Sequence, residues 1–188
     1  YNQNFIKILI ETFMSYSNLT AKETFDLAVK KHRKNNFTEA KNLYQKVIEK
    51  NSNFVDAYNN LGIVFKELRE FNKAINCYEK VININSEHIG AYINLGNVFK
   101  ELGQYNKSIS YYEKAIKINP NYFKVLNNLG SVLHEIGEFQ KSINYYEKAI
   151  ENNPNYLEAY INLGNVLKEK GEIEKAISCY EKAISIKF

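Results

Sequence analysis

Residues 89–122 read IGAYINLGNVFKELGQYNKSISYYEKAIKINPNY, and the Leu-Gly pair inside this stretch decides the fold because it recurs at a fixed spacing. The pair occurs at Leu61-Gly62, Leu95-Gly96, Leu129-Gly130 and Leu163-Gly164, each 34 residues after the one before. Self-similarity at a fixed period of this length is typical of a repeat protein. Function must therefore be sought at repeat positions rather than in single motifs.

The spacing divides the chain into five repeats, whose positions we number from 1 to 34. Their bounds are 21–54, 55–88, 89–122, 123–156 and 157–188, and residues 1–20 remain as an N-terminal extension. Position 7 is always Leu and position 28 is always Ile. Position 24 is always tyrosine: Tyr44, Tyr78, Tyr112, Tyr146 and Tyr180. Positions 24 and 28 form an i, i+4 pair on one helical face.

Each repeat is predicted to form two helices. Apolar residues recur at spacings of three and four at positions 3, 4, 7, 10, 11 and 14, and again at 17, 20, 21, 24, 27 and 28. The break between them, at position 15, is Asn35, Gly103, Gly137 or Gly171 in four repeats, residues that tolerate a left-handed helix end. Arg69 is the exception, so the second repeat should have the most strained turn. Small residues at positions 8 and 20 allow the two helices to approach closely.

These positions resemble the tetratricopeptide repeat, with Leu-Gly at 7 and 8, a small residue at 20, an aromatic at 24 and Pro120 or Pro154 at 32. The resemblance covers residues 21–188. It departs in the first repeat at Thr24, Ala28 and Lys31, and no repeat has Trp at position 4. The resemblance implies an all-α, right-handed α-solenoid of helix-turn-helix repeats whose first helices line a concave groove. It also implies a module that binds other proteins and has no catalytic apparatus.

Composition and motifs exclude several other functions. The net charge is +4, but the lysines concentrate at positions 19 and 26 of the second helices, next to Glu or Gln at 25, which favours a solvated outer face over nucleic-acid binding. There is no apolar run of 18 residues, so no membrane span is expected. There is also no phosphate-binding loop and no Ser-His-Asp set. We therefore expect no cofactor and no catalysis by this segment.

The cysteines and histidines indicate neither disulfides nor metal sites. Cys77 and Cys179 both hold position 23, three repeats apart, too far to bridge within a stack. Two free thiols suit a reducing compartment, so a cytoplasmic location is expected. His32, His88 and His134 lack metal-ligand spacing and are interpreted as isolated surface residues.

The two ends raise separate expectations. Residues 1–20 contain a strongly apolar stretch, interpreted as a helix that covers the end of the stack or, alternatively, packs in an oligomer. Thr20 and Glu23 have the form of a capping box that starts the first repeat helix. Ile177, Ile184 and Ile186 keep the apolar pattern up to the end of the sequence, although a solenoid needs a polar terminal face. Together with the missing initiator Met, this predicts a fragment of a longer protein and possible homo-oligomers through exposed ends.

A column of amides on the first helices forms the candidate binding site. Position 6 is Asn in four repeats and Asp in the first, and two repeats add Asn at position 9, one turn further along the same face. Because a side-chain amide both donates and accepts, such a column could hold the backbone of an extended peptide. The alternative is inherited background, since Asn is abundant and the repeats share an origin. The predicted peptide-binding residues are Asp26, Asn60, Asn94, Asn97, Asn128, Asn162 and Asn165.

The amide column resembles the tetratricopeptide superhelix of protein O-linked N-acetylglucosamine transferases, most closely over residues 91–122. That resemblance implies binding of an extended protein substrate. Three functions therefore stay open: a protein-interaction module, the substrate-recognition region of a larger glycosyltransferase-like enzyme, or a self-assembling scaffold. A clamp for a C-terminal carboxylate is disfavoured, because no three consecutive repeats supply the required cations at positions 5 and 9.

Overall fold

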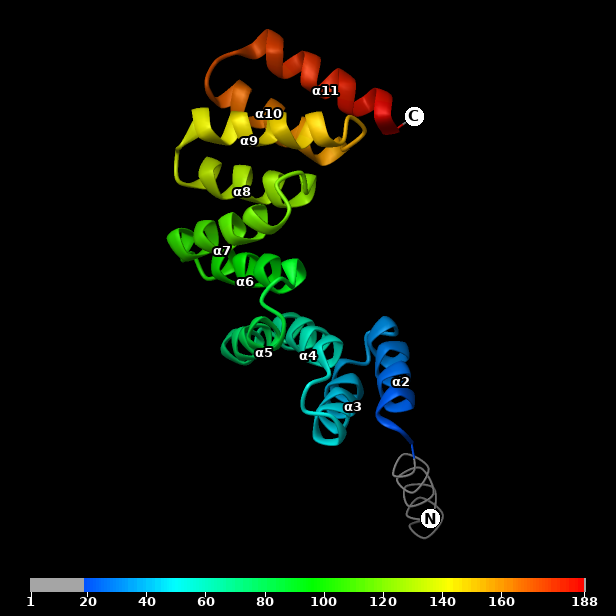
Figure 1. Ribbon diagram of the computed structural model, residues 1–188. Coiled ribbons are helices and arrows are strands. Elements are labelled where there is room, and N and C mark those ends of the chain that lie inside the picture. Colours follow the sequence, from blue (N-terminus) through cyan, green and yellow to red (C-terminus); the bar gives the residue numbers. More distant parts are fainter. Residues whose placement is uncertain (1–18, 188) are drawn as a thin grey trace. The chain divides into compact units, whose positions relative to one another are not determined.

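The computed structural model describes residues 19–187 and is all-α over that part of the chain (Figure 1). Each repeat contributes two helices, as the periodicity predicts, and the α-helical repeat fold is confirmed. The first helices are α2 (Ala21–Arg33), α4 (Val55–Glu67), α6 (Ile89–Glu101), α8 (Phe123–Glu135) and α10 (Leu157–Glu169). The second helices are α3 (Phe37–Lys50), α5 (Phe71–Ile84), α7 (Tyr105–Ile118), α9 (Phe139–Asn152) and α11 (Ile173–Lys187).

Helix α2 begins with the predicted capping box. The Thr20 hydroxyl accepts from the Glu23 backbone N–H at 3.2 Å, and the Glu23 carboxylate accepts from the Thr20 backbone N–H at 2.8 Å. The bond from the Thr20 backbone lowers the pKa of the Glu23 carboxyl. Two backbone donors at the helix start are thus satisfied reciprocally. Residues 1–18 and 188 lie outside the described part, so the predicted end-covering helix stays a prediction.

The turn inside each repeat has a left-handed residue at position 15. The φ angles are 57° at Asn35, 59° at Arg69, 67° at Gly103, 79° at Gly137 and 80° at Gly171. A side chain with a Cβ in this conformation costs roughly 1–2 kcal/mol, which glycine avoids. Asn tolerates this conformation better than most residues, so Arg69 carries the strain that its sequence position predicts.

The two helices of a repeat meet where glycine at position 8 lies against the ring of tyrosine at position 24. A Cβ added to Gly96 would lie 2.4 Å from Cε1 of Tyr112, and the corresponding distance from Gly62 to Tyr78 is 2.5 Å. Both Tyr78 and Tyr112 are fully buried. The ring fills the space that the missing side chain leaves, so glycine here sets the distance between the helices.

The described residues form two compact units, one ending at Ser86 and one beginning at Glu87. In unit 1, α2 to α5 pack in chain order, and in unit 2, α6 to α11 do the same. First helices of unit 2 also contact one another, α6 with α8 and α8 with α10. The boundary falls between the second and third repeats. A single domain over residues 21–188 therefore stays a prediction, and the site is described for each unit separately.

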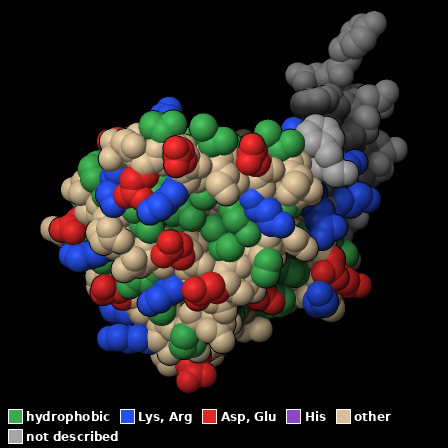
Figure 2. Space-filling view, turned by 90° about the horizontal axis from the view of Figure 1, so that it is seen from above, with side chains coloured by type: hydrophobic (Ala, Val, Ile, Leu, Met, Phe, Trp, Pro, Cys, Tyr) green, Lys and Arg blue, Asp and Glu red, His purple; other side chains and the backbone are tan. Residues whose placement is uncertain are grey.

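The last helix, α11, has an apolar exposed side. Ile177 is 50% exposed, whereas Ile143, at the same position one repeat earlier, is 5% exposed because it packs with Leu163 and Leu167 of α10. Ile184 is 59% exposed and helps line a groove of about 410 Å³ between α10 and α11. In the view from above, apolar side chains are visible among the charged ones (Figure 2).

Candidate functional site

The candidate site of unit 2 lies on the surface formed by the three first helices α6, α8 and α10, which we call the first-helix surface. Positions 6 and 9 lie one helical turn apart on each helix, so their side chains share a face. In α6 these are Asn94 and Asn97, both half-buried. In α8 and α10 they are Asn128 with Ser131 and Asn162 with Asn165, of which only Asn165 is exposed.

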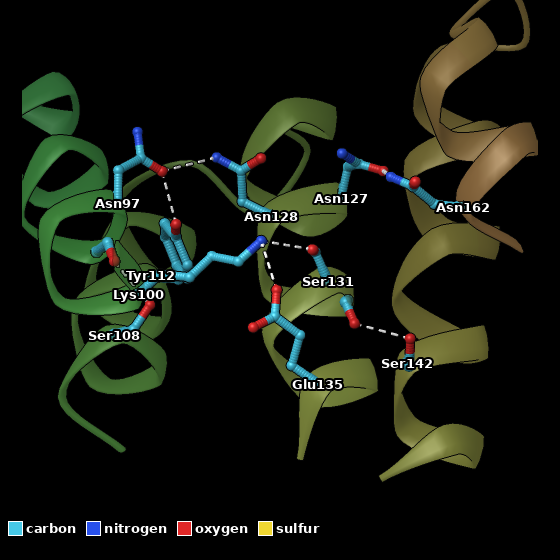
Figure 3. A network of polar contacts seen from close by, with 12 residues as sticks. Asn97, Lys100, Ser108, Tyr112, Asn127, Asn128, Ser131, Glu135, Ser142 and Asn162 are labelled. Atoms are coloured by element: carbon cyan, nitrogen blue, oxygen red, sulfur yellow. Dashed lines mark hydrogen bonds and ion pairs between the residues drawn. The ribbon is translucent and has the colours of Figure 1, made fainter. Parts of the chain in front are cut away.

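Asn97 is held from below and from the side (Figure 3). The Tyr112 hydroxyl donates to Asn97 Oδ1 at 2.6 Å, and Asn128 Nδ2 donates to the same oxygen at 3.3 Å. Burial raises the pKa of the Tyr112 hydroxyl, so it stays protonated and able to donate. Asn97 and Asn128 are 31 residues apart, so this bond links one repeat to the next.

A second link joins α8 to α10. Asn162 Nδ2 donates to Asn127 Oδ1 at 3.0 Å, and Asn127 Nδ2 donates to the Glu158 carboxylate at 3.4 Å. Asn127 is 1% exposed, the most deeply buried amide on this surface. The sequence-based site residues did not include it. The sequence does mark this residue: position 5 is Ile93 in the third repeat and Ile161 in the fifth, but Asn in the fourth repeat between them.

Charged side chains run along one edge of the same surface, from position 12 of one repeat to position 13 of the next. Lys100 Nζ donates to Ser131 Oγ at 2.7 Å and pairs with Glu135 at 3.1 Å (Figure 3). His134 Nε2 lies 2.7 Å from the Glu169 carboxylate. The sequence did not indicate this edge, because the two residues of each ion pair are 35 apart along the chain and belong to no motif.

The interpretation of the histidines as isolated is wrong, although all three are partly exposed. His134 pairs with Glu169, and His88 Nδ1 caps α6 by accepting from the Ala91 backbone N–H at 3.0 Å. His32 Nδ1 lies 3.3 Å from the Tyr44 hydroxyl, and burial lowers the pKa of its imidazole. Each histidine thus has a structural contact, which spacing along the sequence could not indicate.

The other two predicted site residues lie in unit 1. Asp26 is exposed and pairs with Lys22 at 2.8 Å, one turn back along α2. Asn60 is half-buried on α4 and accepts from Asn59 Nδ2 at 3.4 Å. Burial raises the pKa of the neighbouring Tyr44 hydroxyl, and a hydrogen bond with Asn60 opposes this. Asp26 is therefore a solvated acid and not an equivalent of the asparagines.

The amides at position 6 of unit 2 also hold the repeats together, because Asn128 and Asn162 each donate to the preceding repeat. A bond of this kind contributes about 0.5–1.5 kcal/mol net. Asn97, Asn128 and Asn162 are thus part of the joint between repeats as well as of its surface.

Other chemistry is not visible in residues 19–187. No group of three or more His, Cys, Asp or Glu side chains there could hold a metal ion. None of the described helices combines the length and apolar character that crossing a membrane requires. Cys77 and Cys179 are free thiols, and burial raises the pKa of Cys77 to about 12.

Comparisons with known proteins agree with this geometry. Family models described as "TPR repeat" and "Tetratricopeptide repeat" match residues 31–69 with 96–137, residues 124–187 and residues 55–88. Together these matches cover most of the five repeats. The chain belongs to the tetratricopeptide repeat family. No curated protein sequence matches it significantly.

Solved tetratricopeptide structures are similar over most of the chain. A crystal structure of MamA is 28% identical, with a TM-score of 0.76 over 85% of this chain and 94% of that one. YrrB, described as a TPR protein with an unusual peptide-binding site, is 25% identical, with a TM-score of 0.68 over 88% of this chain and 86% of its own. PilF of Pseudomonas aeruginosa is 22% identical, with a TM-score of 0.80 over 88% and 75%, which shows the fold alone.

Proposed function

We propose that this chain is a protein-interaction module whose first-helix surface binds an extended segment of a partner protein. The observation that carries the proposal is the row of asparagines at positions 6 and 9 of unit 2, joined from repeat to repeat by the bond from Asn128 to Asn97 and by the bond from Asn162 to Asn127 at position 5. The tetratricopeptide family and the peptide-binding site in the description of YrrB support it.

The spacing of the row fits a peptide backbone. Packed helices lie roughly 8–10 Å apart, and an extended chain rises about 3.3 Å per residue. Successive first helices therefore meet the ligand at about every third residue. Each asparagine of the row that is bonded within the surface uses one end of its amide there, which leaves the other end for the ligand.

The test uses peptides selected from a random display library by binding to the full chain. Replacing Asn94, Asn128 and Asn162 together by Ala should weaken binding of the selected peptide about tenfold to thousandfold, if three bonds of about 0.5–1.5 kcal/mol are lost. The free energy of unfolding should fall by about 1–3 kcal/mol, because two of these amides also join repeats.

The matched control replaces Asn72, Asn76 and Asn106 by Ala, three exposed asparagines on the second helices α5 and α7. This variant should bind the selected peptide like the parent chain. Unchanged binding by the variant at positions 94, 128 and 162, measured by titration calorimetry on folded protein, would refute the proposed surface.

The substrate-recognition region of a glycosyltransferase-like enzyme is a second proposal, supported by the sequence resemblance of residues 91–122. It uses the same surface but predicts a different ligand set. A substrate arm that grips backbone should select many unrelated peptide sequences, whereas an adaptor should select one motif. The diversity of the display-selected peptides distinguishes them.

A self-assembling scaffold is the third, supported by the exposed Ile177 and Ile184 of α11. Sedimentation over a range of concentrations tests it. A scaffold should associate as concentration rises, and replacing both isoleucines by Glu should abolish that association. A chain that stays monomeric throughout would exclude assembly through this face.

A further inference from the structure

Two asparagines of the first-helix surface, Asn97 and Asn165, have a defined orientation because tyrosines reach them from the interior. Tyr112 crosses from α7 past Gly96, and its hydroxyl ends at Asn97 Oδ1, 2.6 Å away. Tyr180 of α11 does the same two repeats later, and its hydroxyl lies 2.9 Å from Asn165 Oδ1. Position 24 thus contacts position 9 of its own repeat in both places.

The length of the first contact indicates which end of the amide faces inward. A distance of 2.6 Å is typical of O–H···O bonds, whereas N–H···O bonds are most often 2.9–3.0 Å. The oxygen of Asn97 therefore faces the tyrosine. Its Nδ2 group points away from both contacts (Figure 3).

The amides at position 6 have the opposite orientation. Asn128 uses its Nδ2 to donate to Asn97, and Asn162 uses its Nδ2 to donate to Asn127. In both, the carbonyl oxygen is the end that points away from the contact (Figure 3). The surface of unit 2 therefore has acceptors at Asn128 and Asn162 and donors at Asn97 and Asn165.

We infer that Tyr112 and Tyr180 are positioning residues that set this polarity and so decide which backbone groups of the ligand are read. Asn97 and Asn165 donate to ligand carbonyls, and Asn128 and Asn162 accept from ligand N–H groups. The ligand is then an extended segment with a free N–H at the residues opposite position 6, which excludes proline there. This inference rests on the proposed function of the first-helix surface.

Two isosteric variants test the orientation without any ligand. Asn97→Asp keeps an oxygen for Tyr112 and for Asn128, so the melting temperature at neutral pH should stay close to that of the parent chain. Asn128→Asp cannot donate to Asn97 and places two oxygens against each other, so it should melt at a lower temperature. A reversed amide orientation predicts the opposite order: Asn97→Asp would lose its contact with Asn128 and Asn128→Asp would keep it, so Asn97→Asp would be the more destabilising change and the inference would be overturned.

Asn97→Asp and a third variant, Tyr112→Phe, test which backbone groups of the ligand are bound. Asn97→Asp replaces the outward donor by an acceptor, so the display-selected peptide should bind about tenfold or more weakly. Tyr112→Phe removes one of the two contacts that fix the Asn97 amide, so Asn97 can turn together with its remaining partner Asn128. The parent chain should prefer the selected peptide about tenfold over a version N-methylated at the residue opposite Asn128, and this preference should shrink in Tyr112→Phe.

Tyr78→Phe is the matched control. It removes the hydroxyl of a buried tyrosine at the same repeat position, but position 9 of that repeat is Ile63, which has no amide. Its preference between the two peptides should equal that of the parent. An equal loss in both Phe variants would mean that the tyrosines act on folding alone, and the inference would fail.

The outcomes separate the inference from the proposed function. Unchanged binding after replacement of Asn94, Asn128 and Asn162 refutes both. Loss of binding in that variant, together with parent-like binding by Asn97→Asp, leaves the surface standing and refutes the polarity.

Discussion

The contact inside a repeat and the contacts between repeats are built differently, although both join one helix to another. Inside a repeat, glycine at position 8 meets tyrosine at position 24, and the distances are nearly the same at Gly62, Gly96 and Gly164. Between repeats of unit 2, the polar contacts differ at each step. One step uses Asn97 with Asn128, and the next uses Asn127 with Asn162.

The difference teaches which contacts a repeat can vary. A ring packed on a bare backbone tolerates little change, because an added side chain overlaps the ring unless the ring moves. A polar contact has several solutions, since donors and acceptors can be supplied from neighbouring positions. Within the first-helix surface of unit 2, position 5 accordingly varies between Ile93, Asn127 and Ile161.

The largest effect is expected from Gly96→Leu, which places side-chain atoms inside the Tyr112 ring. Overpacking of this kind destabilises by roughly 1–3 kcal/mol and occasionally more. Gly96→Ala should cost less, because Ala28 holds the same position in the first repeat, where both Ala28 and Tyr44 are fully buried. Denaturant unfolding of both variants measures this, and equal midpoints for Leu and the parent chain would contradict the close contact.

A smaller effect is expected from Asn127→Ala, which removes a buried amide from the contact between repeats. The Asn162 amide and the Glu158 carboxylate would lose their bonds to Asn127, which should lower the free energy of unfolding by about 1–3 kcal/mol. Asn127→Ile should cost less, because Ile93 and Ile161 hold this position in the adjacent repeats. If Asn127→Ile lowered the free energy of unfolding more than Asn127→Ala, polar and apolar contacts between repeats would not be interchangeable at this position. The contrast with the invariant contact inside a repeat would then fail.

Within the repeat, Ser108→Ala should have a modest effect. The Ser108 hydroxyl donates to the Gly96 carbonyl at 2.7 Å and is fully buried, so its loss should cost about 0.5–1.5 kcal/mol. Ala40, Ala74 and Ala176 already hold this position elsewhere, which limits the cost. Ser110→Ala, on an exposed site of the same helix, is the control and should leave the unfolding midpoint unchanged.

The smallest effect is expected from Lys100→Met, which removes the charged edge contact to Glu135 and Ser131. Both charged side chains are partly exposed, so the change should be about 0.2–1 kcal/mol. The difference from the parent chain should shrink in high salt, where the pair is screened. A larger difference in high salt than in low salt would show that the ion pair is not its source.

Several parts of the fold could be predicted from residues alone because their causes are local. The 34-residue period, the helix pairs and the left-handed turn residues follow from apolar spacing and from the tolerance of Gly and Asn for positive φ. The capping box at Thr20 needs only residues three apart. The candidate site was predicted as a row of asparagines, but the row lacked Asn127 and included Asp26, which pairs with Lys22.

What the residues alone determined is thus the repeat, its register and the face on which the amides lie, since each depends on neighbours within a few positions. Only the tertiary structure decided how those amides are used. The bonds from Asn128 to Asn97 and from Asn162 to Asn127 join residues 31 and 35 apart, and the tyrosine that orients Asn97 comes from a different helix. A side-chain amide is symmetric in shape and opposite in polarity at its two ends, so its direction depends on partners that only the folded chain brings together.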